Sequence, residues 1–224
     1  MLAADDLASV RVELDDGTTA CEYVHNGVSL WIRDDALTVI KLTTLLTGKP
    51  DSEEENDARG IEAIQLMFAD PEEALMSCID LEEFGELITD VAFEIYGIDL
   101  IGDKETDAPL WDPVQDASLI RVSLRLAYGI DWDEEREKLS WSEFVYLVGA
   151  LPTSTPLGLM IYYRNENNRP EKTKHNKEQI AEFDRLHNLF KLDSTTDPGS
   201  HDRSVEQAQQ AMDDFALALG SLKK

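Results

Sequence analysis

Residues 80–97 have the sequence DLEEFGELITDVAFEIYG, and this stretch indicates the fold class. Asp80 and Glu83 form a capping-box pattern, in which side-chain oxygens accept the otherwise unpaired amide protons of a first helical turn. Apolar residues then recur three and four positions apart, at Leu81, Phe84, Ile88, Val91 and Ile95. Gly97 favours a helix end, because glycine adopts a left-handed conformation without steric cost. The stretch therefore predicts an amphipathic helix.

Comparable helix signals recur along the chain from Asp34 onward. The residues that favour helix starts are Asp34, Ser52 with Glu55, Asp70-Pro71, Ser140 with Glu143, Thr155-Pro156 and Asn176 with Gln179. Before Asp34, apolar and polar residues alternate around Val12 and Leu30, and Asn26-Gly27 favours a tight hairpin turn. The sequence therefore predicts a mainly α, multi-helix domain with a small N-terminal antiparallel β-meander.

A chain of 224 residues is long enough for one large domain, so one shared core is expected. That core should include Trp141, Phe144 and Val148, which lie on one helix face. The expected segments are residues 1–100 (meander and first helices), 101–116 (acidic loop), 117–192 (helical part of the same domain), 193–203 (flexible linker) and 204–224 (C-terminal amphipathic helix).

The charge balance excludes whole classes of partner. The chain carries 46 acidic and 20 basic residues, a formal net charge of -26. Such a charge repels phosphate backbones and anionic lipids, so binding to nucleic acid or to a membrane surface is not expected. The first residues lack the basic start and apolar stretch of a signal peptide, which predicts a cytoplasmic protein.

The sequence contains none of the common catalytic or metal-binding motifs. A Gly-x-Ser-x-Gly elbow, a Walker-type loop, a His-Glu-x-x-His motif and a dinucleotide fingerprint are all missing. Of the two cysteines, only Cys21 has a histidine nearby, His25, and no second pair completes a tetrahedral zinc site. Cys21 and Cys78 are predicted to be free thiols. We therefore predict no enzymatic activity, no cofactor and no metal site.

The tetrapeptide Tyr-Gly-Ile-Asp occurs twice, ending at Asp99 and at Asp131. Each copy follows an apolar helical pattern, so its glycine suits a left-handed helix cap and its isoleucine can fold back on the last turn. A catalytic carboxylate pair would need both aspartates in one pocket, which the spacing does not predict. Helix capping is therefore the preferred interpretation.

Residues 112–164 carry a pattern that resembles a family of bacteriophage tail assembly proteins. The matching positions are Asp116, Tyr128-Gly129-Ile130-Asp131, Leu139, Trp141, Phe144, Leu147, Leu151, Met160 and Tyr163-Arg164. The family pattern has an Asp-rich helix ending in Tyr-Gly-Ile-Asp, a Leu-His-Trp-Trp-like helix with a following Phe, and a short helix ending in Tyr-Arg. This chain has Leu139-Ser140-Trp141-Ser142 instead, so the His and the second Trp of the pattern are missing.

The resemblance implies a non-enzymatic tail assembly chaperone of long-tailed phages. Such a chaperone binds the tape measure protein before the tail tube polymerises around it, and it meets other tail assembly proteins. It would act in the host cell cytoplasm and leave before the virion is complete. A tape measure protein is a very long, largely helical chain with apolar stripes, which a soluble acidic partner could keep from self-association.

The candidate partner-binding residues lie on two predicted helices. They are Val205, Met212, Phe215 and Leu219 on the C-terminal apolar stripe, and Met160 and Tyr163 on the short helix before Arg164. Packing of the stripe on its own domain or on a second copy is an equally open alternative. Two other functions also stay open, an acidic DNA mimic or other phage interaction protein and a metal-dependent hydrolase.

Overall fold

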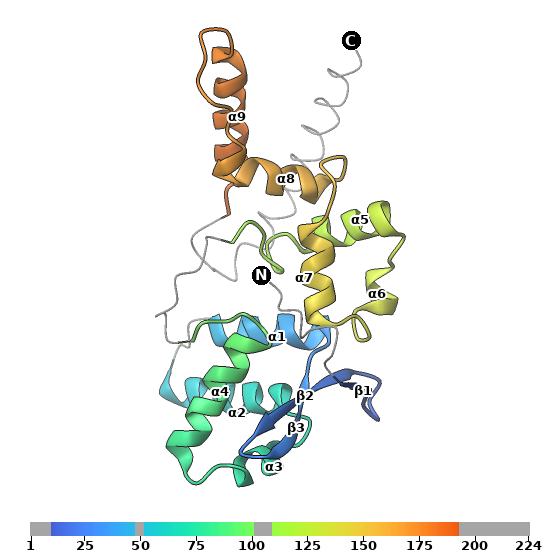
Figure 1. The fold of residues 1–224 in the computed structure, drawn as a ribbon, viewed down its shortest axis with the longest axis vertical. Coiled ribbons are helices and arrows are strands. Elements are labelled where there is room, and N and C mark those ends of the chain that lie inside the picture. Colours follow the sequence, from blue (N-terminus) through green and yellow to red (C-terminus); the bar gives the residue numbers. More distant parts are fainter. Residues whose placement is uncertain (1–9, 48–51, 101–108, 193–224) are drawn as a thin grey trace. The chain divides into compact units, whose positions relative to one another are not determined.

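The computed structural model describes residues 10–47, 52–100 and 109–192, and it has the predicted mainly helical architecture with a small N-terminal antiparallel sheet (Figure 1). The strands are β1 (Arg11–Glu13), β2 (Thr19–His25) and β3 (Val28–Arg33). The helices are α1 (Ala36–Thr47), α2 (Glu53–Met67), α3 (Pro71–Met76), α4 (Leu81–Glu94), α5 (Ala117–Tyr128), α6 (Trp132–Glu135), α7 (Trp141–Gly149), α8 (Pro156–Arg164) and α9 (Lys177–Phe190), with a short 3-10 helix η2 (Glu166–Asn168). Within the described ranges, no helix is both long and apolar enough to cross a membrane.

The sheet has the strand order β1-β2-β3, and both pairs are antiparallel. Asn26 and Gly27 form the predicted turn between β2 and β3, with φ angles of 50° and 78°. Positive φ angles at both central residues match the right-handed twist of the two strands. The register places Cys21 opposite Ile32, and both side chains are buried.

Most of the predicted helix starts are confirmed. The side chains of Ser52, Asp70, Asp80, Ser140 and Thr155 each accept a hydrogen bond from the backbone amide three residues later. Asn176 does not cap α9, because its Oδ1 accepts from the amide of Thr173 at 2.8 Å instead.

The predicted start of α1 at Asp34 is wrong by one residue. The Asp34 amide still donates to the Thr19 carbonyl at 3.0 Å, so the pairing with β2 continues through this position. The Asp34 carboxylate accepts from Thr19 Oγ1 at 2.7 Å and pairs with Arg11. The cap is supplied by Asp35, whose Oδ1 accepts from the Thr38 amide at 2.8 Å. Strand pairing therefore delays the helix by one position.

The chain divides into two compact units that alternate along the sequence. Unit 1 comprises Met1–Thr106 and Asp133–Tyr146, and unit 2 comprises Asp107–Trp132 and Leu147–Lys224. The boundary after Tyr146 falls inside α7. The predicted segments 193–203 and 204–224 lie outside the described residues.

The core of unit 1 lies between the sheet and the helices α1, α2 and α4. Its fully buried large side chains include Leu30, Ile32, Leu42, Met67, Phe68, Leu87 and Val91. The segment that returns after unit 2 pairs with the start of α1. The Ala36 amide donates to the Leu139 carbonyl at 2.8 Å, and the Trp141 amide donates to the Asp34 carbonyl at 2.6 Å. Residues distant in sequence thus complete unit 1.

The prediction of a buried α7 face is confirmed for two of its residues. Phe144 and Val148 are 0% exposed. Trp141 is only partly buried, so the prediction is wrong there. Its indole Nε1 donates to the Tyr96 carbonyl at 3.0 Å, which keeps one end of the ring at a polar position.

Unit 2 is built on α8, which packs against α5 and α9. The Leu157 amide donates to Ser123 Oγ at 3.0 Å and joins α8 to α5. Arg164 forms a bidentate ion pair with Asp116, with Nη1 to Oδ2 at 2.6 Å and Nη2 to Oδ1 at 2.9 Å. Both side chains are buried, at 7% and 3% exposure. The last residue of α8 is therefore fixed to the start of α5.

Candidate functional site

The two predicted contacts on α8 both belong to unit 2, and one of them is buried and the other partly buried. Met160 is 8% exposed. Tyr163 is partly buried, and its ring centroid lies 5.4 Å from that of Phe183 and 6.1 Å from that of Phe190. The remaining predicted contacts lie outside the described residues, at Val205, Met212, Phe215 and Leu219.

The two Tyr-Gly-Ile-Asp sequences end helices, as predicted. Gly97 and Gly129 have φ angles of 71° and 73°. The Gly97 amide donates to the Phe93 carbonyl four residues before it, which is the simple left-handed cap, and the Ile98 amide donates to the Ala92 carbonyl. Gly129 forms the same left-handed cap through the Arg125 carbonyl. Asp131 pairs with Arg125 on the same helix end.

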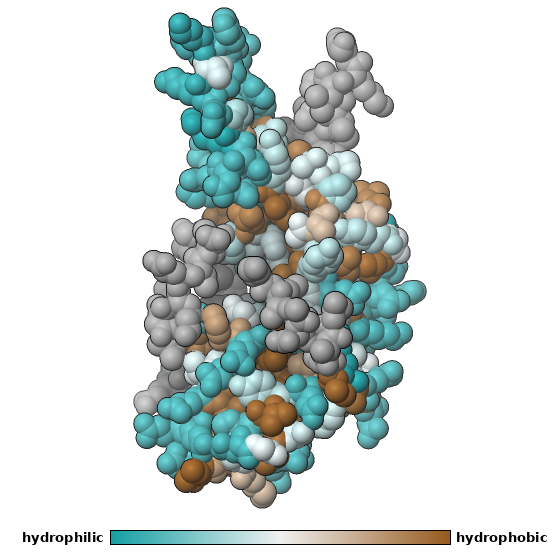
Figure 2. All heavy atoms as spheres, in the orientation of Figure 1, coloured by the Kyte–Doolittle hydropathy of each residue, from teal (hydrophilic) through white to brown (hydrophobic). Residues whose placement is uncertain are grey.

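The connection between α3 and α4 exposes a run of apolar side chains that we did not predict. We call residues 75–81 the α3–α4 turn. Its apolar members are Leu75 (44% exposed), Met76 (81%), Ile79 (90%) and Leu81 (77%). Hydrophobic side chains reach the surface at this end of unit 1 in Figure 2. We expected Leu81 on the buried stripe of α4, but the buried face of that helix begins only at Phe84.

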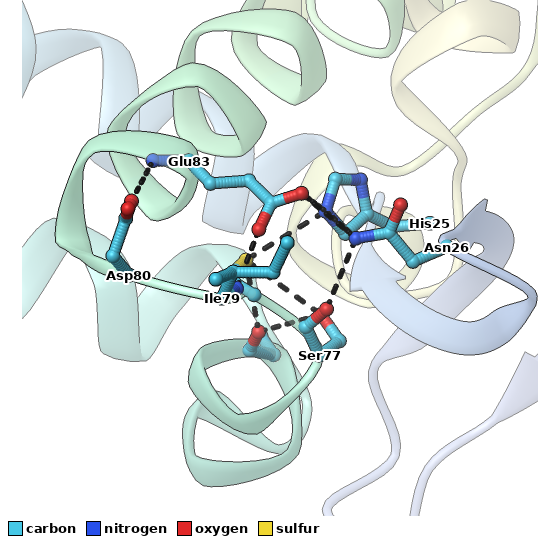
Figure 3. Close-up of polar contacts among 8 residues, drawn as sticks. His25, Asn26, Ser77, Ile79, Asp80 and Glu83 are labelled. Atoms are coloured by element: carbon cyan, nitrogen blue, oxygen red, sulfur yellow. Dashed lines mark hydrogen bonds and ion pairs between the residues drawn. The ribbon is translucent and has the colours of Figure 1, made fainter.

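Hydrogen bonds hold the α3–α4 turn in one conformation (Figure 3). Asp80 Oδ1 accepts from the Glu83 amide at 3.0 Å, and Glu83 Oε2 accepts from the Ile79 amide at 2.5 Å. Asn26 Nδ2, in the β2–β3 turn, donates to Glu83 Oε1 at 2.9 Å and to the Ser77 carbonyl at 3.2 Å. Asn26 of the β2–β3 hairpin is therefore hydrogen-bonded to the segment that carries the exposed apolar side chains.

Three potential metal ligands lie at the base of this turn. His25 Nε2 is 3.7 Å from Cys78 Sγ and 3.7 Å from Glu83 Oε1. The ligand atoms of these residues all lie within 4.8 Å of one another. Imidazole nitrogen, sulfur and carboxylate oxygen are the donor types that bind Zn²⁺ in proteins. We call His25, Cys78 and Glu83 the His-Cys-Glu cluster.

The local hydrogen bonds also set the charge of the cluster. The pKa of Glu83 lies below its ordinary value, first because the Ile79 amide donates to its carboxylate and then because the Asn26 side chain does. Glu83 is therefore a carboxylate at neutral pH. Its side chain is 24% exposed and that of His25 is 19% exposed, so a small solute can reach the cluster from solvent.

Sequence spacing did not identify the His-Cys-Glu cluster. His25 and Cys78 are 53 positions apart, and Cys21 is the cysteine that lies near His25 in the sequence. Cys21 is 6% exposed in the core, whereas Cys78 is half-buried beside the histidine. The available signal was local, because Cys78 precedes an Asp-x-x-Glu helix start that directs Glu83 back over the turn.

Residues 28–192 match the model of a family described as "Bacteriophage Gp15 protein". No curated protein and no solved structure matches the chain. The matched range begins at β3 and ends just after α9, and it includes Cys78 and Glu83. It therefore covers well over half of the chain and parts of both units. The chain belongs to the bacteriophage Gp15 protein family, which points to a role in phage structure or morphogenesis.

Proposed function

We propose that this protein is a tail assembly chaperone, which binds the tape measure protein during tail morphogenesis. It acts in the host cytoplasm, by binding alone and without catalysis, and it is not part of the mature virion. Membership of a phage family supports the setting of this proposal. The exposed apolar side chains of the α3–α4 turn are the observation that carries it.

The residues that carry the tail-protein pattern have structural roles. Asp116 and Arg164 form the buried ion pair of unit 2, and Tyr128 donates to the Leu147 carbonyl at 3.1 Å. The Leu139 carbonyl accepts from the Ala36 amide at 2.8 Å in unit 1. These contacts stabilise the fold and leave the α3–α4 turn free for a partner.

The size of the apolar surface suits reversible binding. Complete burial of a Leu, Ile or Met side chain contributes about 1.5–3 kcal/mol. Met76, Ile79 and Leu81 together could therefore contribute several kcal/mol, from which the cost of association is subtracted. A chaperone must release its client before the tail is complete, and binding of this strength permits release.

The charges around the turn define the kind of client it should bind. Acidic residues flank the apolar side chains at Glu72, Glu73, Asp80, Glu82 and Glu86. An apolar centre with an acidic rim complements an amphipathic helix whose apolar stripe is bordered by Lys or Arg. The net charge of -26 keeps the complex soluble while the client is still unassembled.

Co-expression tests the proposed contact. The wild-type protein should move its cognate tape measure protein from the insoluble to the soluble fraction, and the two should co-purify. Ile79→Glu places a charge at the most exposed apolar position and should abolish both effects. Leu126→Glu is the matched control, because Leu126 is a 66% exposed apolar residue on α5 of unit 2. Ile79→Glu should leave the melting temperature unchanged.

Three results would contradict the proposal or its contact surface. If the two wild-type proteins neither co-purify nor change each other's solubility, the chaperone function is wrong. If Ile79→Glu and Leu126→Glu reduce co-purification equally, the α3–α4 turn is not the contact surface. If Ile79→Glu instead converts a dimer to a monomer without affecting the tape measure protein, the turn binds a second copy of the chain.

The C-terminal residues Val205, Met212, Phe215 and Leu219 form a second proposed contact, independent of the first. Phe215→Glu should weaken co-purification of the tape measure protein if this stripe also binds the client. An unchanged amount of co-purified client would limit the contact to the α3–α4 turn.

A further inference from the structure

We propose that His25, Cys78 and Glu83 bind one zinc ion, which links the β2–β3 turn to the α3–α4 turn. This proposal does not depend on the identity of the client protein. It rests on the geometry of the cluster, on the chemistry of its donor atoms and on the position of Asn26.

The ligand atoms already have nearly the spacing of a zinc site. With ordinary zinc bond lengths, adjacent ligand atoms of a tetrahedral site are about 3.3–3.6 Å apart. His25 Nε2 lies 3.7 Å from both Cys78 Sγ and Glu83 Oε1. Cys78 Sγ and the Glu83 carboxylate oxygen lie within 4.8 Å of each other, so side-chain movements of up to about an ångström would bring all three ligand atoms to this spacing.

The position of Asn26 shows where a cation would be stabilised. Asn26 Nδ2 lies 3.1 Å from His25 Nε2, 2.9 Å from Glu83 Oε1 and 3.2 Å from the Ser77 carbonyl oxygen. An amide nitrogen carries only two hydrogens, whereas three acceptors converge on it. Figure 3 shows this convergence between the hairpin and the start of α4. Zn²⁺ would bind the lone pairs of His25 Nε2 and Glu83 Oε1, with water as its fourth ligand, and would leave the Asn26 amide to the Ser77 carbonyl.

The donor set selects the metal. Ca²⁺ and Mg²⁺ prefer sites made of oxygen atoms, and the cluster offers one carboxylate only. Imidazole and thiolate are typical ligands of Zn²⁺. A thiolate and a carboxylate would also neutralise the two positive charges of the ion. Zn²⁺ is therefore the divalent cation that this cluster matches best among the three.

The bound ion would fix the elements that present the exposed apolar side chains. His25 is the last residue of β2, Cys78 lies between α3 and α4, and Glu83 lies in the first turn of α4. A metal bond between these positions closes a long loop of the chain and restricts the unfolded state. Ile79 follows Cys78 and precedes Glu83 by four residues in the sequence, so metal bonds to both ligands would restrict the backbone of Ile79.

Binding is tested with the full-length protein after removal of metal with a chelator. Titration with Co²⁺, as a spectroscopic substitute for Zn²⁺, should give one equivalent bound and a sulfur-to-cobalt charge-transfer band. Zn²⁺ should then displace the Co²⁺ and should raise the melting temperature. Absence of the sulfur band, or a melting temperature unaffected by Zn²⁺, would overturn the proposal.

Matched variants separate the cluster from the rest of the chain. Cys78→Ser should remove the sulfur band, whereas Cys21→Ala should keep it. His25→Gln should weaken zinc binding by at least about 100-fold, because even outer-shell changes weaken metal binding about 10- to 100-fold. His175→Gln removes an exposed histidine elsewhere and should bind zinc like the wild type. Equal zinc affinity in Cys78→Ser and in the wild type would contradict the site.

A measurement on the wild type avoids any effect of substitution on folding. Cys78 is half-buried and Cys21 is buried, so iodoacetamide should modify Cys78 faster in the chelated protein. Zn²⁺ should protect Cys78 from alkylation, as measured by mass spectrometry of its peptide. Modification of Cys78 at the same rate with and without Zn²⁺ would overturn the proposal.

Discussion

Asp35 is a buried carboxylate that satisfies only half of its hydrogen-bonding capacity. It is 0% exposed, and Oδ1 caps α1 through the Thr38 amide. Oδ2 has no hydrogen-bond partner among the residues that the structure describes. Burial raises the pKa of Asp35 above its ordinary value of 3.8, and the cap hydrogen bonds only partly oppose this.

The raised pKa predicts how Asp35 contributes to stability at different pH values. The folded state holds the Asp35 proton to a higher pH than the unfolded chain does. Its stabilising contribution is therefore complete below 3.8 and is lost as the pH rises through the folded-state pKa. Asp35→Asn keeps an oxygen acceptor for the cap but cannot ionise. Urea unfolding from pH 7 downward should show the wild type gaining stability relative to Asp35→Asn.

Asp35→Ala is the control for the cap. It should be about 0.5–2 kcal/mol less stable than Asp35→Asn at every pH, because neither variant ionises and only Asn keeps the capping oxygen. Identical pH dependence in the wild type and in Asp35→Asn would show that Asp35 titrates normally in the folded protein.

Phe144 provides the test of packing at the scale of one side chain. Phe144→Ala should lower the free energy of unfolding by about 3–5 kcal/mol, because it leaves a cavity at a fully buried position. Tyr146→Ala on the same helix should change it by less than about 0.5 kcal/mol, since Tyr146 is 64% exposed. Equal effects of the two substitutions in denaturant unfolding would contradict this packing.

Elements were predictable from the sequence where their causes are local. Asp80 with Glu83 and Ser140 with Glu143 mark helix starts that depend only on neighbouring residues. Asn26-Gly27 likewise fixed the hairpin turn. The prediction that Asp34 caps α1 was wrong because Asp34 pairs with Thr19 of β2, which is distant in sequence. The exposure of Leu81 was not predicted. Periodicity shows which residues share one face of a helix, but it does not show how far along the helix a neighbouring element covers that face.

The candidate site was predictable only in part. Cys78 and Glu83 are separated by a helix start that the sequence revealed. His25 joins them through the packing of the hairpin on the α3–α4 turn, and no local signal reports such packing. The predicted contacts on the helix before Arg164 have different environments, because Met160 is buried in unit 2 whereas Tyr163 is only partly buried.

The start of α8 gives a prediction at the scale of an element. A Cβ atom at Gly158 would lie 2.2 Å from the Pro152 carbonyl oxygen, which is backbone and cannot easily move. Gly158→Ala should therefore displace the first turn of α8 and destabilise unit 2. Gly60→Ala is the control, because a Cβ on α2 meets nothing within 4 Å and should stabilise that helix by about 0.5–1 kcal/mol.

Thermal unfolding followed by circular dichroism measures both glycine variants. A melting temperature of Gly158→Ala at or above that of the wild type would show that α8 approaches the Pro152 carbonyl less closely than described.

At the scale of the whole molecule, the length of the chain predicts one shared core. Length and composition do not reveal that the chain passes from unit 1 to unit 2 and back again. The pairing of residues 34–37 with residues 136–141 connects distant positions. Neither segment has a strand pattern of its own. The two units were therefore visible only in three dimensions.

A chain that ends at Leu192 should remain folded. The described cores of both units are made by residues up to Phe190, and α5, α8 and α9 bury one another's apolar faces. Limited proteolysis of the full-length protein should cut first within residues 193–203, as their composition predicts. Loss of cooperative unfolding in the shortened chain would show that the last segment belongs to a core.

The return of residues 133–146 to unit 1 has a consequence for synthesis on the ribosome. The amide of Ala36 and the carbonyl of Asp34 receive their partners only after Leu139 and Trp141 have been translated. At about 5–20 residues per second, unit 1 waits on the order of seconds after its first stretch has emerged. During that interval the backbone groups of Asp34 and Ala36 lack their partners from residues 139 and 141. All of α5 is synthesised before unit 1 can be completed.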